Sequence, residues 1–258
     1  MLRFAANIGW LFTERPFLER FAAARAAGFE GVEFASPYDL PAAEIARRLQ
    51  DEGLACVLFN LPMGDRARGD AGLACRPERR DEFRDGVARA LEYAEALRPT
   101  KVNCLAGVAR PGEDRAALES VLVENLGFAA ERFTDSGVPL VTEPLNELDT
   151  PGFLLPRQDD GARVIAKVGA EGLGLQCDLY HVARMRDDAS SILARLRGII
   201  RHVQFADAPG RGEPGTGSVP LREQVALLRR LGYDGWVAAE YKPTKRTEET
   251  LAWLQEFS

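Results

Sequence analysis

Short apolar segments alternate with longer amphipathic segments along the whole chain. Continuous apolar runs such as LACVLFN (54–60) are typical of parallel strands that are covered on both faces. The pattern therefore predicts a series of buried parallel strands, which we place at 3–8, 31–35, 54–60, 101–107, 138–144, 173–178, 199–207 and 235–241.

The segments between these runs show apolar residues at helical spacing. Gly28 and Gly53 follow two of them, and glycine commonly ends a helix. We predict helices from Thr13 to Gly28 and over 41–51, 77–97, 113–135, 156–169, 189–197, 219–231 and 246–257. Strands alternating with helices indicate a parallel sheet.

Eight strand–helix units follow one another without a linker, which favours an α/β fold of the (β/α)8 barrel type. We predict one domain over 1–258. The main alternative is a doubly wound open sheet, which would carry a Gly-rich fingerprint after the first strand. The sequence there reads NIGWLFTE and lacks that fingerprint.

Polar side chains lie at the ends of the last four predicted strands: Glu143, Asp178, Gln204 and Glu240. Active-site groups of such barrels come from the carboxyl ends of the strands, so these four are expected to meet. Three carboxylates in one place repel each other unless a cation lies among them. An all-oxygen set suits Mg²⁺ or Mn²⁺ better than zinc, so we predict a divalent metal site.

Two further interpretations follow from these strand ends. Any one of the acids could simply cap the helix that follows, but their recurrence in successive units favours the metal site. Strand alternation places Cys177 outward, against the helices, and His202 on the face of Gln204, one layer deeper and more typical of a structural residue. The same alternation places Lys242 on the face of Glu240, just above the mouth of the barrel.

Other residues near these strand ends could bind a substrate. His181 follows Asp178 by three residues, and Arg184, Arg211 and Lys242 are cations that could hold an anionic group. Each of His181, Arg184 and Arg211 could equally be an ordinary structural or solvated side chain. The loop PGRGEPGTG (209–217) lacks the Lys-Ser/Thr ending of a P-loop, so we expect a flexible lid there.

Composition narrows the class of protein. A net charge of −6 without a basic stripe argues against a nucleic-acid partner. The cysteines, at 56, 75, 104 and 177, are scattered, as in a protein with reduced thiols. The sequence shows neither a signal peptide nor an apolar stretch of roughly 18 residues. We expect a cytoplasmic protein with a small-molecule substrate, no membrane partner, and a possible homo-oligomer.

Several motifs together resemble the hydroxypyruvate isomerase family of the xylose isomerase-like TIM barrels. The resemblance runs from the first strand to the last helix. It is carried by FNLPMGD (59–65), VNCLAG (102–107), EPLN (143–146), DLYH (178–181), HVQFADAPGR (202–211), EPGTG (213–217) and GYDGWVAAEYKP (232–243).

The resemblance implies a divalent metal held by Glu143, Asp178, Gln204 and Glu240. It also implies that the two glutamates transfer protons and that His181 contacts the substrate. The chain departs from the family pattern at Gly212, where close relatives are expected to have His, and in the Arg-rich loop 64–75. Both departures lie in loops that are expected to border the substrate, so they bear on the identity of the substrate and not on the metal site.

The implied reaction is the isomerisation of hydroxypyruvate to tartronate semialdehyde through a cis-enediolate, a step of glyoxylate metabolism. A 2-oxo-tetronate isomerase and a ketose 3-epimerase use the same chemistry, although the epimerases usually have His where this chain has Gln204. An abasic-site endonuclease shares the barrel but uses several histidines, and this chain has two. Outside enzymes, a non-catalytic sugar-acid binding protein is the alternative.

Overall fold

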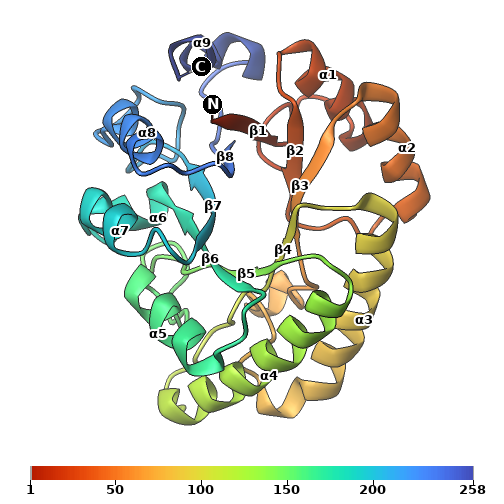
Figure 1. The fold of residues 1–258 in the computed structure, drawn as a ribbon, viewed down its shortest axis with the longest axis vertical. Coiled ribbons are helices and arrows are strands. Elements are labelled where there is room, and N and C mark those ends of the chain that lie inside the picture. Colours follow the sequence, from red (N-terminus) through yellow and green to blue (C-terminus); the bar gives the residue numbers. More distant parts are fainter. Residues whose placement is uncertain (1, 258) are drawn as a thin grey trace.

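A closed barrel of eight parallel strands, paired in sequence order, forms the centre of the computed structural model (Figure 1). The structure describes residues 2–257, one residue fewer at each end than the predicted domain. Pairing of the first strand with the last closes the ring and confirms the predicted (β/α)8 TIM barrel. The strands are β1 (Arg3–Asn7), β2 (Gly31–Phe34), β3 (Ala55–Asn60), β4 (Lys101–Asn103), β5 (Leu140–Thr142), β6 (Leu173–Asp178), β7 (Ile200–Phe205) and β8 (Trp236–Ala239).

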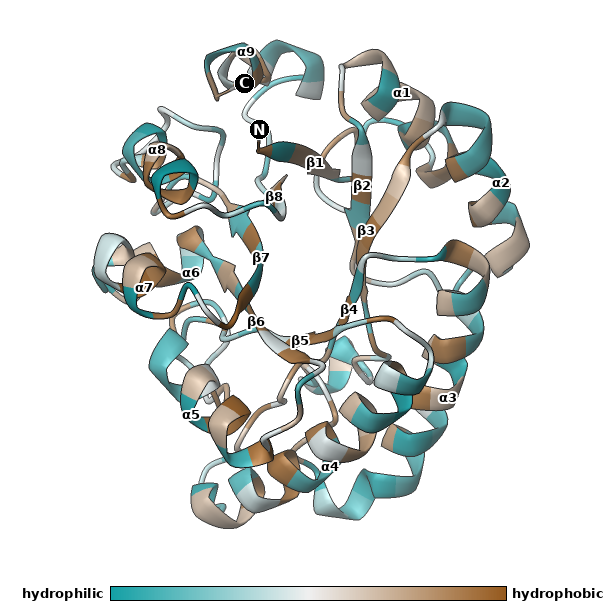
Figure 2. Ribbon diagram, in the orientation of Figure 1, coloured by the Kyte–Doolittle hydropathy of each residue, from teal (hydrophilic) through white to brown (hydrophobic). Residues whose placement is uncertain are grey.

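The helices surround the barrel. They are α1 (Arg20–Ala26), α2 (Ala42–Glu52), α3 (Arg80–Leu97), α4 (Arg115–Asp135), α5 (Gln158–Val168), α6 (Leu179–Arg184), α7 (Ala189–Arg195), α8 (Leu221–Arg230) and α9 (Ala252–Phe257), with 3-10 turns η1 (Phe17–Glu19), η2 (Arg66–Arg68), η3 (Pro77–Arg79) and η4 (Thr247–Thr250). Figure 2 shows hydrophobic and hydrophilic residues mixed along the outer helices, as amphipathic helices require. Among residues 2–257, none of the helices has both the length and the apolar character needed to span a bilayer.

The structure departs from the sequence pattern in several places, including the strand predicted at 138–144, of which only Leu140–Thr142 pairs as β5. Helix α6 was not predicted, because it is a single short element that starts directly at the end of β6 and is too brief to show a helical period. The predicted strand 101–107 shrinks to the three residues of β4. Cys104, Leu105 and Ala106 are buried but lie outside the strand. The apolar sequence there therefore reflects burial of these residues and not their pairing with a neighbouring strand.

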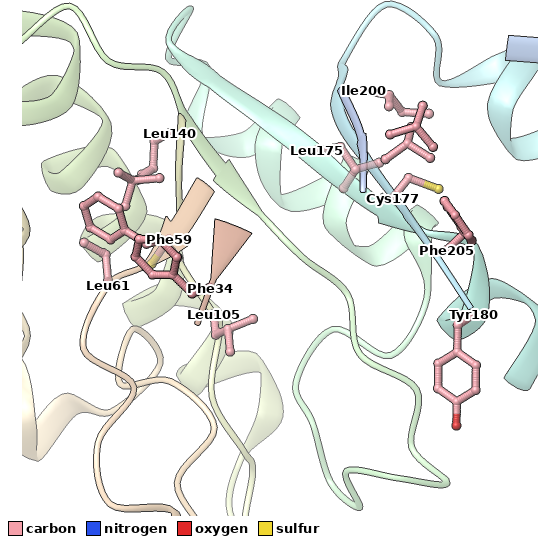
Figure 3. Packing of buried hydrophobic residues seen from close by; sticks show 14 of the residues in the cluster. Phe34, Phe59, Leu61, Leu105, Leu140, Leu175, Cys177, Tyr180, Ile200 and Phe205 are labelled. Atoms are coloured by element: carbon pink, nitrogen blue, oxygen red, sulfur yellow. The ribbon is translucent and has the colours of Figure 1, made fainter. Parts of the chain in front are cut away.

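The main hydrophobic core lies between the barrel wall and the helices. Figure 3 shows Leu175, Cys177, Ile200 and Phe205 from β6 and β7 within this core. Cys177 therefore points outward as predicted, and burial raises the pKa of its thiol. A smaller apolar cluster fills part of the barrel interior and consists of Ala5, Val57, Leu58, Val141, Trp236 and Ala238.

Candidate active site

A cavity of about 430 Å³ lies at the carboxyl ends of the strands. This volume is within the ~300–1,000 Å³ that is typical of small-molecule sites. Larger grooves on the outer surface lack the predicted acids, whereas this cavity contains two of them. Its polar lining residues include Asn60, Arg66, Asp70, Glu143, Asp149, His181, Arg211 and Glu240.

The structure brings Glu143 and Asp178 together with His181. One potential ligand atom from each lies within 4.8 Å of the others. Glu143 follows β5 directly, Asp178 ends β6, and α6 begins at once and carries His181. Oδ1 of Asp178 accepts a 2.9 Å hydrogen bond from the Tyr180 backbone N–H and caps α6, while Oδ2 lies 3.5 Å from His181 Nε2. Asp178 thus caps α6 and also belongs to the cluster with Glu143 and His181.

The position of the proton on His181 follows from its neighbours. The backbone N–H of Asn146 donates to Nδ1 at 3.3 Å, and the Asn146 side-chain amide nitrogen lies 2.6 Å from the same atom. Because Nδ1 accepts, the proton of the neutral ring is on Nε2, which faces Asp178 and Glu143. Burial lowers the pKa of His181 to about 3, so the ring stays neutral. His181 is therefore a hydrogen-bond donor to the cavity.

The acidic groups are costly to ionise in this place. Burial, followed by repulsion from Glu240 and Asp178, raises the pKa of Glu143 well above its ordinary value. Burial also raises the pKa of Asp178 to about 6 and that of Glu240 to about 8. The nearby Arg211 guanidinium opposes both of the latter increases. The positive charge near these three acids is thus too small to offset burial and their mutual repulsion.

Arg211 lies between two aromatic rings and bridges two of the acids. Its guanidinium carbon is 4.5 Å from the Trp10 ring centroid and 4.7 Å from that of Tyr180. Nη2 lies 3.0 Å from Glu240 Oε2 and 3.4 Å from Asp178 Oδ2. This cation–π stacking and ion pairing fix the guanidinium at the wall of the cavity.

The loop that carries Arg211 is tied to a buried carboxylate. Asp207 accepts hydrogen bonds of 2.8–2.9 Å from the backbone N–H groups of Ala208, Gly215, Gly217 and Val219. Gly217 also approaches closely, because a Cβ there would lie 2.0 Å from the Ala208 carbonyl oxygen. The predicted flexible lid therefore has an internal anchor that holds both of its ends.

Gln204 lies on β7 and is held by two side chains of the barrel interior. Its Nε2 donates to Glu33 Oε1 at 2.6 Å, and its Oε1 accepts from Gln176 Nε2 at 2.6 Å. His202 Nε2 lies 2.7 Å from Glu33 Oε2, and the side-chain amide of Asn7 donates to Glu33 Oε1 at 2.9 Å. His202 and Gln204 thus share one face of β7, as alternation predicted. Glu33 itself was missed, although a lone acid inside the apolar run GVEFA was an available signal.

Two of the predicted substrate-binding cations lie elsewhere. Arg184 donates to Asp149 Oδ1 at 3.1 Å and lines an outer groove instead of the cavity. Lys242 is exposed and is not among the cavity's lining residues. Strand β8 ends at Ala239, so the alternation that predicted Lys242 just above the barrel mouth does not reach that far. The structure thus brings His181 and Arg211, but neither Arg184 nor Lys242, into the cavity lining.

Sequence reasoning also missed Arg66 and Asn103. Asn103 ends β4 and donates from Nδ2 to Glu143 Oε2 at 3.0 Å, which orients that carboxylate. Arg66 lines the cavity from the loop after β3. The Arg-rich composition of that loop was visible in the sequence, but nothing in the pattern indicated which arginine faces inward.

The donor set fits a divalent cation. Glu143 and Asp178 are buried, carry raised pKa values and turn carboxylate oxygens toward a common point. A bound cation would relieve this repulsion, and hard cations prefer carboxylate and amide oxygens. Glu240 and Gln204 lie at the neighbouring strand ends, where Arg211 and Glu33 now hold them.

Comparisons with known proteins agree with this architecture. The family described as "Xylose isomerase-like TIM barrel" matches residues 21–257. A hydroxypyruvate isomerase of Escherichia coli (strain K12) is 42% identical over 257 residues, covering 100% of both chains. A 2-oxo-tetronate isomerase of Cupriavidus necator is also 42% identical and covers 100% of this chain and 99% of its own.

Solved structures show the same fold. A crystal structure described as an AP endonuclease, family 2, from Brucella melitensis is 41% identical, with a TM-score of 0.96 over 99% of each chain. A D-allulose 3-epimerase from Methylomonas sp. shares the fold at 16% identity, with a TM-score of 0.81 over 100% of this chain and 97% of its own. The chain belongs to the xylose isomerase-like TIM barrel family and is a hydroxypyruvate isomerase-like enzyme.

Proposed function

We propose that this enzyme interconverts the aldose and ketose forms of a small hydroxy-carbonyl acid with the help of a divalent metal, and that hydroxypyruvate is converted to tartronate semialdehyde. The observation that carries the proposal is a pair of glutamates, buried Glu143 and partly buried Glu240, which line one cavity from the ends of β5 and β8. Two carboxyl groups with raised pKa values are suited to taking up and returning a proton near neutral pH.

The proposed reaction moves two protons and changes no net oxidation state. One glutamate removes a proton from the carbon that bears the hydroxyl, which gives a cis-enediolate. A proton then returns to the neighbouring carbon, while the hydroxyl proton passes to the former carbonyl oxygen. Glu143, oriented by Asn103, and Glu240, oriented by Arg211, are the proposed pair.

We propose Glu143, Asp178, Gln204 and Glu240 as the metal ligands, with Mg²⁺ or Mn²⁺ as the ion. When bound, such an ion supplies positive charge for the oxygens that become negative in the enediolate. The chain's own residues provide the rest. Nε2–H of His181 donates a hydrogen bond to a substrate oxygen, and Arg211 favours the ionised forms of the two acids it contacts and so opposes the increase of their pKa values.

Two observations bear on the rival functions. The full-length relatives at 42% identity act, by their names, on a hydroxypyruvate and on a 2-oxo-tetronate, so a four-carbon acid is the second candidate substrate. An endonuclease with a histidine-rich zinc cluster is not favoured, because His202 contacts Glu33 inside the barrel and only His181 faces the cavity among the residues described.

Glu143→Gln tests the proposal. We expect turnover of hydroxypyruvate to fall by about 10²–10⁴-fold, which is the usual contribution of a general base. Glu147→Gln is the matched control, because Glu147 is exposed on the same loop and is not in the cavity lining. Metal content of both proteins is measured alongside. Full activity of Glu143→Gln with metal bound would refute the assignment of Glu143 as a base.

A further inference from the structure

The cavity holds six side chains that carry a formal charge: Arg66, Asp70, Glu143, Asp149, Arg211 and Glu240. Most of them are acidic, so a negatively charged substrate entering this cavity needs a cation that is free to bind it. The proposed substrates carry a carboxylate. Which charged groups are already engaged therefore decides where that carboxylate binds.

The acids on the rim are paired with partners that lie outside the cavity. Asp70 accepts from Arg79 at 2.6 Å. Asp149 accepts from Tyr180 at 2.6 Å and from Arg184 at 3.1 Å. These contacts fix both carboxylates as parts of the wall, and neither Arg79 nor Arg184 is a lining residue.

Arg211 is also engaged. Its Nη2 contacts Glu240 and Asp178, and its guanidinium is stacked between Trp10 and Tyr180. A substrate carboxylate would have to compete with buried Asp178 and partly buried Glu240 for this group. Arg211 thus offers less free positive charge to a ligand than its position suggests.

Arg66 differs from all of these. Its guanidinium makes no hydrogen bond or ion pair with any residue in the described part of the chain, and the side chain is exposed. It is the charged lining residue without a partner among residues 2–257.

The turn that carries Arg66 is well held. Asp65 caps η2 by accepting from the Ala67 backbone N–H at 2.8 Å, and Asp70 accepts from the Asp65 backbone N–H at 2.8 Å. Gly72, at φ +104°, packs so closely on the loop after β4 that a Cβ there would lie 2.2 Å from the Leu105 carbonyl oxygen. The backbone therefore presents Arg66 to the cavity from a fixed position.

We propose that Arg66 binds the carboxylate of the substrate and so selects acids over neutral hydroxy-ketones. The inference rests on the proposed function for the identity of the substrate, but its binding step can be tested without turnover. A planar guanidinium can hold a carboxylate through two parallel hydrogen bonds. Arg66 would then fix the acid end, leaving the hydroxyl and carbonyl carbons for Glu143 and Glu240.

Arg68 provides a matched control. It lies on the same turn η2, is exposed, and is not in the cavity lining. Arg66→Ala and Arg68→Ala remove the same charge from the same loop. Any general effect of net charge or of turn stability should therefore appear in both variants, whereas loss of a carboxylate contact should appear in Arg66→Ala alone.

The kinetic test uses hydroxypyruvate and dihydroxyacetone, which has a hydroxymethyl group in place of the carboxylate. We expect Arg66→Ala to lower kcat/KM for hydroxypyruvate by about 10-fold or more, mainly through KM, as loss of a hydrogen-bonded charge predicts. For dihydroxyacetone the change should stay below about twofold. Arg66→Lys should recover part of the loss, and Arg68→Ala should resemble the parent enzyme.

The binding test uses pyruvate, which lacks the hydroxyl needed for isomerisation, titrated into each protein by calorimetry. Weaker binding by Arg66→Ala alone supports the proposal even if the parent enzyme does not isomerise hydroxypyruvate. Equal pyruvate binding by all the variants, or an equal loss of kcat/KM for both substrates, overturns it. Failure of the proposed function would instead appear as absent turnover in the parent enzyme.

Discussion

The Nε2 atom of Gln204, on β7, donates a 2.6 Å hydrogen bond to Oε1 of Glu33, a fully buried carboxylate on β2. An amide has one nitrogen and one oxygen, so fixing the nitrogen also fixes the direction of Oε1. Oε1 accepts one hydrogen bond, from Gln176, and retains a second lone pair for a cation. Glu33 thereby orients the proposed ligand Gln204.

Loss of Glu33 should weaken metal binding. We expect Glu33→Leu to reduce Mn²⁺ affinity by about 10–100-fold, the usual effect of removing a group that orients a ligand. Glu33→Gln retains an acceptor oxygen for Gln204 and should keep most of the affinity. Free Mn²⁺ measured by EPR during a titration gives the affinities, with circular dichroism as the check on folding. Parent-like affinity in Glu33→Leu would contradict this role.

Lys101 should make stability depend on pH in the alkaline range. Burial lowers its pKa from 10.5 to about 8 in the folded protein. Between these two values the unfolded chain binds more protons than the folded one, so the free energy of unfolding rises with pH. The rise attributable to Lys101 is up to about 3 kcal/mol.

Lys101→Met isolates this contribution. Denaturant unfolding of both proteins at pH 7.5 and pH 10.5 gives the stability difference at each pH. The parent protein should gain stability relative to Lys101→Met as the pH rises. A difference that is the same at both pH values would show that Lys101 is not held at a lowered pKa.

Asp207→Asn should loosen the loop that carries Arg211. An amide has only one acceptor atom, so two of the four backbone N–H groups now bound by Asp207 would lose their partner. Each hydrogen bond to a charged group contributes about 1.5–3 kcal/mol. We expect faster tryptic cleavage after Arg211, followed by mass spectrometry. Asp234→Asn, a change at an exposed acid, is the control, and equal cleavage rates would refute the anchoring role.

The parts that could be predicted from sequence depend on local periodicity. The barrel followed from the alternation of apolar and amphipathic segments, and Glu143, Asp178 and Glu240 followed from their position at strand ends. Glu33 and Arg66 could not be found in this way, because Glu33 meets Gln204 across the barrel and Arg66 reaches the cavity through a loop. Lys242 failed to reach the cavity lining because strand alternation ends before it.

The most direct test of the account is isomerisation by metal-stripped enzyme in D₂O, followed by proton NMR. After treatment with EDTA, hydroxypyruvate should persist, and adding Mg²⁺ or Mn²⁺ should restore conversion to tartronate semialdehyde. Solvent deuterium should enter the product at the carbon that receives the returning proton. Undiminished conversion without metal, or no conversion in the presence of either ion, would contradict the account.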